Sequence, residues 1–147
     1  MTAEDFSQAG ELVCPAGTPA ALRTAVDAGA DSIYCGFRNA TNARNFPGLN
    51  FTPEELHASV AYAHERGSRV LLALNTYPPA GKVDLWRDAA EQGMRAGVDA
   101  FILAHMGVAP HIAPAHPGPR LHPSVHAPAS RPESTRSARQ NCGVPRW

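Results

Sequence analysis

The sequence predicts an α/β protein with parallel strands, forming part of a TIM-like (β/α) barrel. Short apolar runs alternate with segments of helical periodicity through the first two thirds of the chain. Gly29, Gly67 and Gly97 follow successive helical segments at spacings of 38 and 30 residues, which match β/α units. No G-x-G-x-x-G motif follows the first apolar run, which disfavours a dinucleotide-binding doubly wound sheet. The rhythm of strands and helices alone fits both architectures.

The first β/α unit begins with an apolar run at residues 11–14 (ELVC), where we expect a strand. Thr18 is a good N-cap and Pro19 suits the first helical position, so a helix is expected to start there and to end at Gly29. Helical spacing places four apolar residues on one face: Ala21, Leu22, Ala25 and Val26. Residues 32–35 (SIYC) form the second expected strand.

The next helix has the strongest start signal in the sequence. Thr52 is followed by Pro53 and then by Glu55, which is the spacing of a capping box. Gly67 is expected to end this helix in a left-handed conformation. Before it, four residues follow at helical spacing: Leu56, Val60, Ala63 and His64. Residues 69–74 (RVLLAL) are apolar after the first position, as expected of a strand covered on both faces.

A third helix is expected over residues 83–96, ended by Gly97. Four of its residues are expected to point inward: Leu85, Trp86, Ala89 and Met94. Residues 98–104 (VDAFILA) form the fourth expected strand. The same Ala-Gly-x-Asp sequence precedes this strand and the strand at residues 32–35, so the two joints are expected to be built alike.

The pattern changes after Gly107, because residues 108–147 contain 8 of the 14 prolines. Interior prolines remove helical hydrogen bonds, so no regular helix is expected there. Residues 120–126 (RLHPSVH) alternate like a fifth strand, but Pro123 restricts them to a sheet edge or an extended coil. We therefore divide the chain into a flexible N-terminus (1–10), about four β/α units (11–107) and a mostly irregular tail rich in Pro, His and Arg (108–147).

Charge and composition exclude several classes of function. Residues 1–107 hold 8 Lys and Arg against 12 Asp and Glu, and the tail holds 5 Arg and one Glu. The tail arginines have no interleaved aromatic residues, so a nucleic-acid partner is not expected. No apolar run reaches the length of about 18 residues that spans a bilayer, and no leader is evident, which predicts a cytoplasmic protein. The three cysteines form no C-x-x-C pair and the tail histidines match no closed zinc site, so no metal is expected.

The carboxyl ends of parallel strands meet at one edge of a sheet, where ligands bind. Four segments are expected at this mouth: residues 14–17, 37–50, 75–77 and 105–107. The 37–50 loop is polar and longer than most βα connections, which is typical of a binding or lid loop.

Within this long loop, Arg44 can bind a carboxylate or phosphate, with Asn42 and Asn45 fixing the orientation. The amide of Asn75 either points into the mouth or caps a turn. The alternative interpretation is a loop that satisfies its own turns, with Arg44 paired to a surface acid. No residue is identified as catalytic, because no Ser-His-Asp or Cys-His set can be placed and strand cysteines are usually inert.

Three stretches resemble a known family: ELVCPAGTPAALRTAVDAGADSIYCG, TNARNFPGLNFT and LALNT. They resemble the N-terminal part of the peptidase U32 family, in particular its UbiU branch, which acts in ubiquinone biosynthesis. The resemblance covers about residues 11–107, and the Thr41–Thr52 loop is its most specific part. Where relatives often end the fourth strand with Leu-Ala-Asp, this chain has Leu103, Ala104 and His105.

The resemblance implies a TIM-like barrel and a role in oxygen-independent hydroxylation, as a heterodimer with a sister protein of the UbiV type. It also implies a 4Fe-4S cluster in full-length relatives, held by four cysteines beyond the first half of the barrel. Cys14, Cys35 and Cys142 do not match those positions, so no cofactor is expected in this chain.

We therefore expect a truncated UbiU-like protein that is inactive alone, because four strands cannot close a barrel that needs eight. The alternatives are a collagenase-like U32 peptidase, a relative that acts in tRNA or rRNA hydroxylation, a small module that binds an anionic metabolite, or a non-functional fragment.

Overall fold

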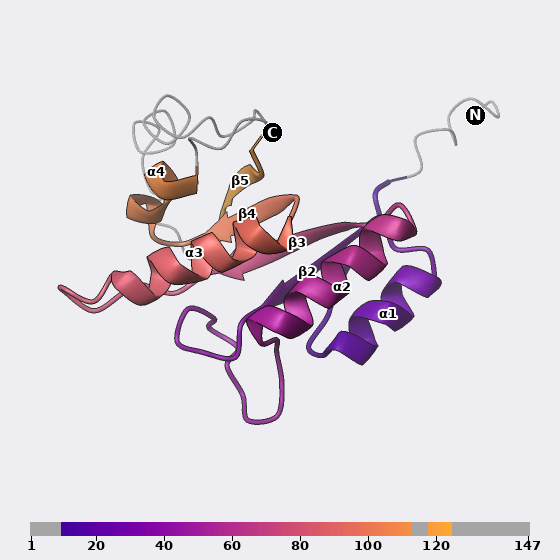
Figure 1. The fold of residues 1–147 in the computed structure, drawn as a ribbon, viewed down its shortest axis with the longest axis horizontal. Coiled ribbons are helices and arrows are strands. Elements are labelled where there is room, and N and C mark those ends of the chain that lie inside the picture. The colour runs from indigo at the N-terminus through magenta and orange to yellow at the C-terminus, as the bar shows by residue number, and fades with distance from the viewer. Residues whose placement is uncertain (1–9, 113–117, 125–147) are drawn as a thin grey trace.

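The computed structural model describes residues 10–112 and 118–124, which contain a five-stranded parallel sheet (Figure 1). The strand order is β1-β2-β3-β4-β5, so each strand lies beside its predecessor in the chain. This order excludes a doubly wound sheet, whose strand order reverses at a switch point, and gives the partial barrel that was predicted. The strands are β1 Val13–Pro15, β2 Ser32–Gly36, β3 Arg69–Leu74, β4 Ala100–Leu103 and β5 Arg120–Pro123.

The helices lie together on one face of this sheet, and Figure 1 shows α1, α2 and α3 side by side in front of the strands. A barrel places its helices outside in the same way. The helices are α1 Pro19–Asp27, α2 Pro53–Glu65, α3 Asp84–Ala96 and α4 Ala109–Ile112, with a 3₁₀ turn, η2, at Met106–Val108. Among the described residues, no helix is long and apolar enough to span a bilayer.

The two faces of the sheet differ in what covers them. Cys35, Leu72, Phe101 and Leu121 are paired in register and fully buried toward the helices. The neighbouring row on the opposite face contains Gly36, Ala73, Ile102 and His122, and a second row contains Pro15, Tyr34 and Leu71. Tyr34, Leu71, Ile102 and His122 are only half-buried, because no described helix packs on this helix-free face.

The predicted N-caps Thr18 and Thr52 are both confirmed by hydrogen bonds. The Thr18 hydroxyl accepts a hydrogen bond from the Ala21 N–H at 3.1 Å. The Thr52 hydroxyl accepts from the Glu55 N–H at 3.2 Å, and the Glu55 carboxylate accepts from the Thr52 N–H at 3.0 Å. This reciprocal pair is a capping box, which satisfies two N–H groups at the start of α2.

The repeated Ala-Gly-x-Asp joint has a structural role at the amino ends of the strands. The Asp31 carboxylate accepts from the Leu12 N–H at 2.7 Å, and the Asp31 carbonyl accepts from the Arg69 N–H at 2.9 Å. Asp99 repeats the arrangement, accepting from the N–H groups of Val70 at 2.8 Å and Arg120 at 2.9 Å. Each aspartate therefore joins three adjacent strand starts, at the edge opposite the loops expected to bind ligand.

Several element boundaries differ from expectation. β1 begins at Val13 and β4 spans Ala100–Leu103, because only these residues enter the ladder. Ala21 of α1 is exposed although it shares the predicted apolar face, and Leu22 and Val26 alone on that helix are buried. The inward placement of Leu85 was wrong, because its side chain is 39% exposed. Trp86 and Ala89 are buried as expected.

The expectation of no regular helix after Gly107 is wrong for one turn, α4. Pro110 lies in the first turn of this helix, where its missing N–H removes no helical hydrogen bond. Residues 120–123 form β5 at the sheet edge, with Pro123 at the last position. Ile112 and Leu121 belong to the buried core, so described residues beyond 107 pack on the β/α units. The predicted irregularity of residues 125–147, and the flexibility of residues 1–9, lie outside the described residues.

Gly93 of α3 is expected to resist the substitution Gly93→Ala. Ala normally stabilises a helix interior by about 1 kcal/mol relative to Gly. Here a Cβ would lie 2.6 Å from Leu72 Cδ2 and 2.7 Å from Phe101 Cε1, in the buried core. We expect overpacking of about 1–3 kcal/mol to dominate, and urea denaturation to show a lower free energy of unfolding. The exposed Asp88→Ala variant of the same helix is the control. Equal or higher stability of Gly93→Ala would contradict this packing.

Candidate ligand-binding site

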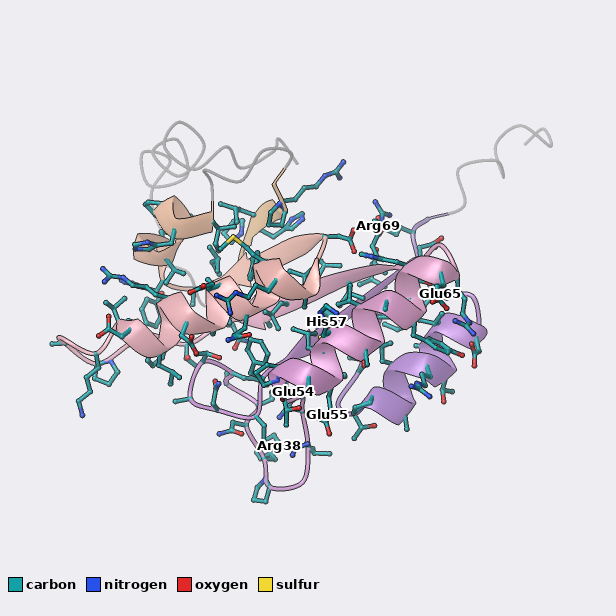
Figure 2. All side chains as sticks on the ribbon, viewed as in Figure 1. Arg38, Glu54, Glu55, His57, Glu65 and Arg69 are labelled. Carbon is teal, nitrogen blue, oxygen red and sulfur yellow. The ribbon has the colours of Figure 1, made fainter. Side chains whose placement is uncertain are left out.

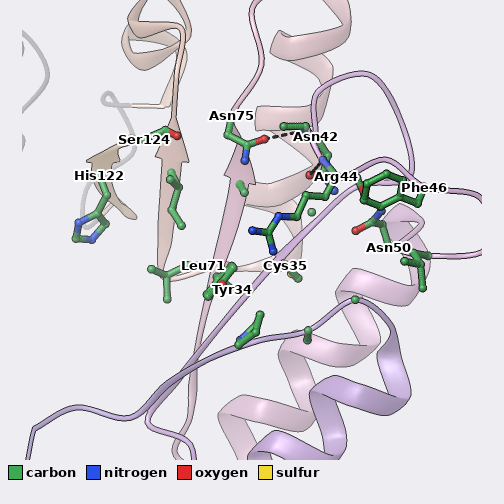
Figure 3. A pocket seen from close by; sticks show the side chains of 18 of the residues that line it. Tyr34, Cys35, Asn42, Arg44, Phe46, Asn50, Leu71, Asn75, His122 and Ser124 are labelled. Atoms are coloured by element: carbon green, nitrogen blue, oxygen red, sulfur yellow. Dashed lines mark hydrogen bonds between the residues drawn. The ribbon is translucent and has the colours of Figure 1, made fainter. Parts of the chain in front are cut away.

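A pocket of about 710 Å³ opens where the helix-free face meets the carboxyl ends of the strands (Figure 3). All five strands or the loops after them contribute to its wall. The 37–50 loop supplies one side, with Asn42, Arg44 and Phe46 among its lining residues. The strand face supplies the other side, with Tyr34 and Ile102. This is the position at which barrel proteins bind ligands.

Asparagine side chains hold the backbone of the loop around Arg44. The buried Asn42 amide accepts from the Arg44 N–H at 3.0 Å and donates to the Phe37 carbonyl at 3.2 Å. The Asn50 amide donates to the Arg44 carbonyl at 2.7 Å. The N–H and the carbonyl of Arg44 are therefore both hydrogen-bonded to asparagine side chains. These bonds fix the position of the Arg44 backbone.

Asn75, which follows β3, ties this loop to the sheet. Its carbonyl oxygen accepts from the Ala43 N–H at 2.8 Å, and Figure 3 draws the amide nitrogen on the pocket side of that contact. The sequence left open whether Asn75 caps a turn or points into the mouth. In the structure the side-chain oxygen of Asn75 accepts a hydrogen bond from the loop backbone, and the residue also lines the pocket.

The end of the loop is fixed by Asn50 and Arg38. Asn50 has a positive φ of 74°, and its N–H donates to the Gly17 carbonyl at 2.6 Å. Arg38 donates to the carbonyls of Leu49 and Asn50, both at 3.1 Å, and pairs with Glu55 at 3.4 Å. Figure 2 shows Arg38 and Glu55 together at the loop end of α2, far from Arg69. These hydrogen bonds and the ion pair hold the end of the loop against α2 and the β1–α1 connection.

Gly36, the last residue of β2, makes room for the buried asparagine. A Cβ at this position would lie 2.4 Å from the Asn42 amide nitrogen. That distance is far inside van der Waals contact, so any larger residue would displace Asn42. The requirement for glycine here is steric, since the backbone conformation of Gly36 is an ordinary strand conformation.

The side chains that line the pocket carry positive charge and no negative charge. Its lining residues include Arg44 and His122 and contain no Asp or Glu. Among the described residues the Arg44 guanidinium makes no ion pair, whereas Arg38 and Arg69 are paired with glutamates. Figure 3 shows the Arg44 side chain extending from the loop over the strands toward Tyr34 and Leu71. A carboxylate or phosphate is the natural counter-charge for this guanidinium.

His122 adds charge to the pocket only in acid. Burial lowers the pKa of His122 below its ordinary value of 6.5, and the nearby Arg120 lowers it further, while Glu11 opposes both. The imidazole is therefore mostly neutral at pH 7. Arg44 carries the positive charge of the pocket under neutral conditions.

The thiols of the described residues do not suit catalysis or cluster binding. Cys35 faces the helices and is buried, and this burial raises the pKa of its thiol to about 12. Cys14 is half-buried on β1. No group of three or more His, Cys, Asp or Glu residues in the described part of the chain could hold a metal ion. The described residues thus do not fit a 4Fe-4S cluster, and Cys142 lies outside them.

The structure brings together three of the four predicted site residues. Asn42, Arg44 and Asn75 line the pocket, whereas Asn45 is exposed on the loop and is not part of the lining. Of the four segments expected at the mouth, residues 105–107 are also outside the lining. His105 instead packs edge to face on Tyr77, with ring centroids 6.3 Å apart. The roles of these residues in binding remain predictions.

Sequence reasoning missed the strand-face part of the pocket: Tyr34, Leu71, Ile102 and His122. The alternation of side chains along each strand was the available signal. It was obscured because both faces of these strands are apolar.

Comparisons with known proteins agree with this architecture. The family model described as "Peptidase family U32" matches residues 17–146. The chain belongs to peptidase family U32. An uncharacterized protease of Methanocaldococcus jannaschii is 35% identical over 97 residues, covering 66% of this chain and 23% of that protein. The tRNA hydroxylation protein P of Helicobacter pylori strain 26695 is 34% identical over 109 residues, covering 69% of this chain and 26% of that protein. This U32 chain thus spans about a quarter of the length of these relatives.

A solved structure supports the barrel assignment at the level of fold. The 2,3-dimethylmalate lyase, a member of the PEP mutase/isocitrate lyase superfamily, superimposes with a TM-score of 0.51 and 19% identity. The match covers 90% of this U32 chain and 55% of the lyase.

The Asn50→Ala variant is expected to loosen the loop. It removes the hydrogen bond to the Arg44 carbonyl and places alanine at a positive φ, each of which costs about 1 kcal/mol or more. Urea denaturation should show a loss of about 2–3 kcal/mol, and amide exchange should increase at Arg44 and Phe46. Asn45→Ala is the matched control, because Asn45 is exposed on the same loop. Equal free energies of unfolding and equal amide exchange in the two variants would contradict the role of Asn50 in holding the loop.

Stability should fall in acid partly through His122. The pKa of this residue is lower in the fold than its ordinary value of 6.5, so the unfolded chain binds more protons in acid. Its contribution is fully present above about pH 6.5 and is lost as the pH falls below that value. Urea midpoints between pH 7.5 and 5 should therefore fall less for His122→Gln than for the unmodified chain. An unchanged slope in His122→Gln would count against this role.

Proposed function

We propose that this pocket binds the anionic substrate of a hydroxylation protein of the U32 family, with Arg44 as the anion contact. The observation that carries the proposal is a guanidinium without an ion pair among the described residues, in a pocket whose lining contains no carboxylate. Its backbone is fixed on both sides by asparagine amides. A fixed backbone reduces the conformational freedom that the loop loses when Arg44 binds a ligand.

The hydroxylation part of the proposal rests on relatives. One relative, from Helicobacter pylori, bears the name tRNA hydroxylation protein P. The Thr41–Thr52 loop resembles the UbiU branch, which favours a role in oxygen-independent hydroxylation during ubiquinone biosynthesis. In this proposal the chain supplies recognition and orientation of the substrate. Inserting a hydroxyl group is an oxidation, and no described residue is assigned to that step.

The cofactor and the partner remain proposals from the family resemblance. A 4Fe-4S cluster would supply redox chemistry in full-length relatives, but the described residues do not provide its ligands. A heterodimer with a UbiV-like sister protein, and a cytoplasmic location, likewise follow from the resemblance and the sequence alone.

A peptidase function is the second candidate, because the relative from Methanocaldococcus jannaschii is named a protease. The described pocket gives it little support. Its lining contains Cys35, whose side chain faces the helices with a raised pKa, and this thiol is a poor nucleophile. The geometry therefore favours binding of an anion over attack on a peptide.

Arg44→Ala is expected to weaken anion binding by about 10- to 100-fold, the usual loss for one charge-assisted contact. NMR titration of the purified chain with inorganic phosphate and with benzoate measures the affinity. Arg87→Ala is the matched control, because it removes an equal charge from the exposed surface of α3. Arg44→Ala binding both anions as well as the unmodified chain would refute the proposal.

A further inference from the structure

We infer that this chain pairs with a second copy of itself through the free edge of β1, as an antiparallel pair of strands centred on Val13. The sheet of the second copy continues that of the first across a two-fold axis between the two β1 strands. The inference does not depend on the proposed anion contact at Arg44. It rests on exposed apolar side chains, a self-complementary backbone and an uncovered flank of α1.

The edge of β1 exposes two large apolar side chains in succession. Leu12 is 50% exposed and Val13 is 46% exposed, and the alternation of the strand directs them to opposite faces of the sheet. Ile33, which lies beside Cys14 in the next strand, is fully buried. Both faces of the sheet therefore lack cover at this edge, which favours burial against a partner.

The backbone of β1 directs alternate residues to β2 and to the free edge. The Leu12 carbonyl accepts from the first N–H of β2 at 3.2 Å, and the Ala16 N–H donates to the Tyr34 carbonyl at 2.9 Å. Val13 and Pro15 therefore point their backbone groups away from β2. Pro15 has no N–H, so another strand can satisfy this edge only in some registers.

An antiparallel pair with a second copy fits the groups that this edge offers. When Val13 lies opposite Val13 of the second copy, the two residues exchange both N–H···O bonds. Pro15 then lies opposite Glu11 of the second copy and accepts from its N–H. The missing N–H of Pro15 affects only a carbonyl at the exposed end of the pair. A parallel partner strand would instead place a carbonyl opposite this missing N–H.

The same register avoids contact between like charges, which are destabilising when directly opposite. Among residues 10–16 only Glu11 is charged at neutral pH. Its carboxylate is paired with Arg69 of its own chain at 2.7 Å. In the antiparallel pair Glu11 lies opposite Pro15 of the second copy, so no acid faces another acid.

Helix α1 offers an apolar flank above this edge. Figure 1 shows α1 at the end of the row of helices, with α2 on one side. Arg23 lies 5.0 Å from the Tyr62 ring of α2, so helical periodicity places Ala21, Ala25 and Ala28 on the opposite flank. Ala21 and Ala28 are exposed, and Ala25 is half-buried. The two-fold axis brings this flank toward the same flank of the second copy, where small side chains permit close approach.

Light scattering after size exclusion, over a range of concentrations, tests the association. We expect a dimer whose proportion rises with concentration. Val13→Lys places like charges opposite each other and should raise the dissociation constant by at least about 10-fold. Leu85→Lys is the matched control, because Leu85 is exposed on α3, away from β1. A chain that stays monomeric up to about 1 mM would overturn the inference, as would a dimer that Val13→Lys leaves unchanged.

A pair of alanine variants tests the helix flank. Ala21→Glu should raise the dissociation constant by about 10-fold, because it directs acids from both copies toward each other. Ala20→Glu makes the same change at an exposed position on the other side of α1 and should leave the dimer unchanged. Equal effects of the two variants would overturn the two-fold arrangement.

A disulfide tests the register. In the antiparallel pair Leu12 lies opposite Cys14 of the second copy, in a non-hydrogen-bonded pair with Cα atoms about 4.5 Å apart, within disulfide range. Oxidation of Leu12→Cys with glutathione disulfide should therefore link the introduced thiol to Cys14 of the second copy. The control combines Leu12→Cys with Cys14→Ser and should give no covalent dimer. Equal yields from the two proteins, or no link in Leu12→Cys, would overturn the inference.

Discussion

The hydrogen bonding of the Arg44 peptide groups is the constraint on which the site depends. A loop at the mouth of a parallel sheet has no strand or helix to pair its backbone, and unpaired buried peptide groups are costly. In this chain asparagine amides take that role, so the loop is ordered without regular structure. The same contacts that satisfy the backbone fix the position of the Arg44 backbone, from which its side chain extends. The order of the loop and the proposed anion contact therefore depend on one set of hydrogen bonds.

The two edges of the sheet differ in structure, and we propose ligand binding at only one of them. At the amino edge, Asp31 and Asp99 join neighbouring strand starts through charged hydrogen bonds. At the carboxyl edge, loops enclose a pocket in which Arg44 forms no ion pair with any residue that the structure describes. Barrel proteins commonly separate the two roles in this way. The repeated Ala-Gly-x-Asp sequence is explained by the first role, so it carries no information about the ligand.

Local signals in the sequence were sufficient for most of the fold. The capping box at Thr52 and the left-handed ends at Gly29, Gly67 and Gly97 depend on neighbouring residues only, so they could be read directly. The partners of asparagine amides depend on contacts between distant segments, and the sequence left two options open for Asn75. The strand-face wall was missed because apolar runs do not reveal which face a helix covers.

Gly36 and Asn42 have a consequence for how this loop can vary. The space for the asparagine amide exists only because the strand residue beneath it lacks a side chain. Neither position tolerates independent change, since a larger strand residue expels the amide and loss of the amide leaves two peptide groups unpaired. The pair should therefore covary across relatives, with glycine retained wherever asparagine is retained. Divergence of this loop would then proceed through paired replacements.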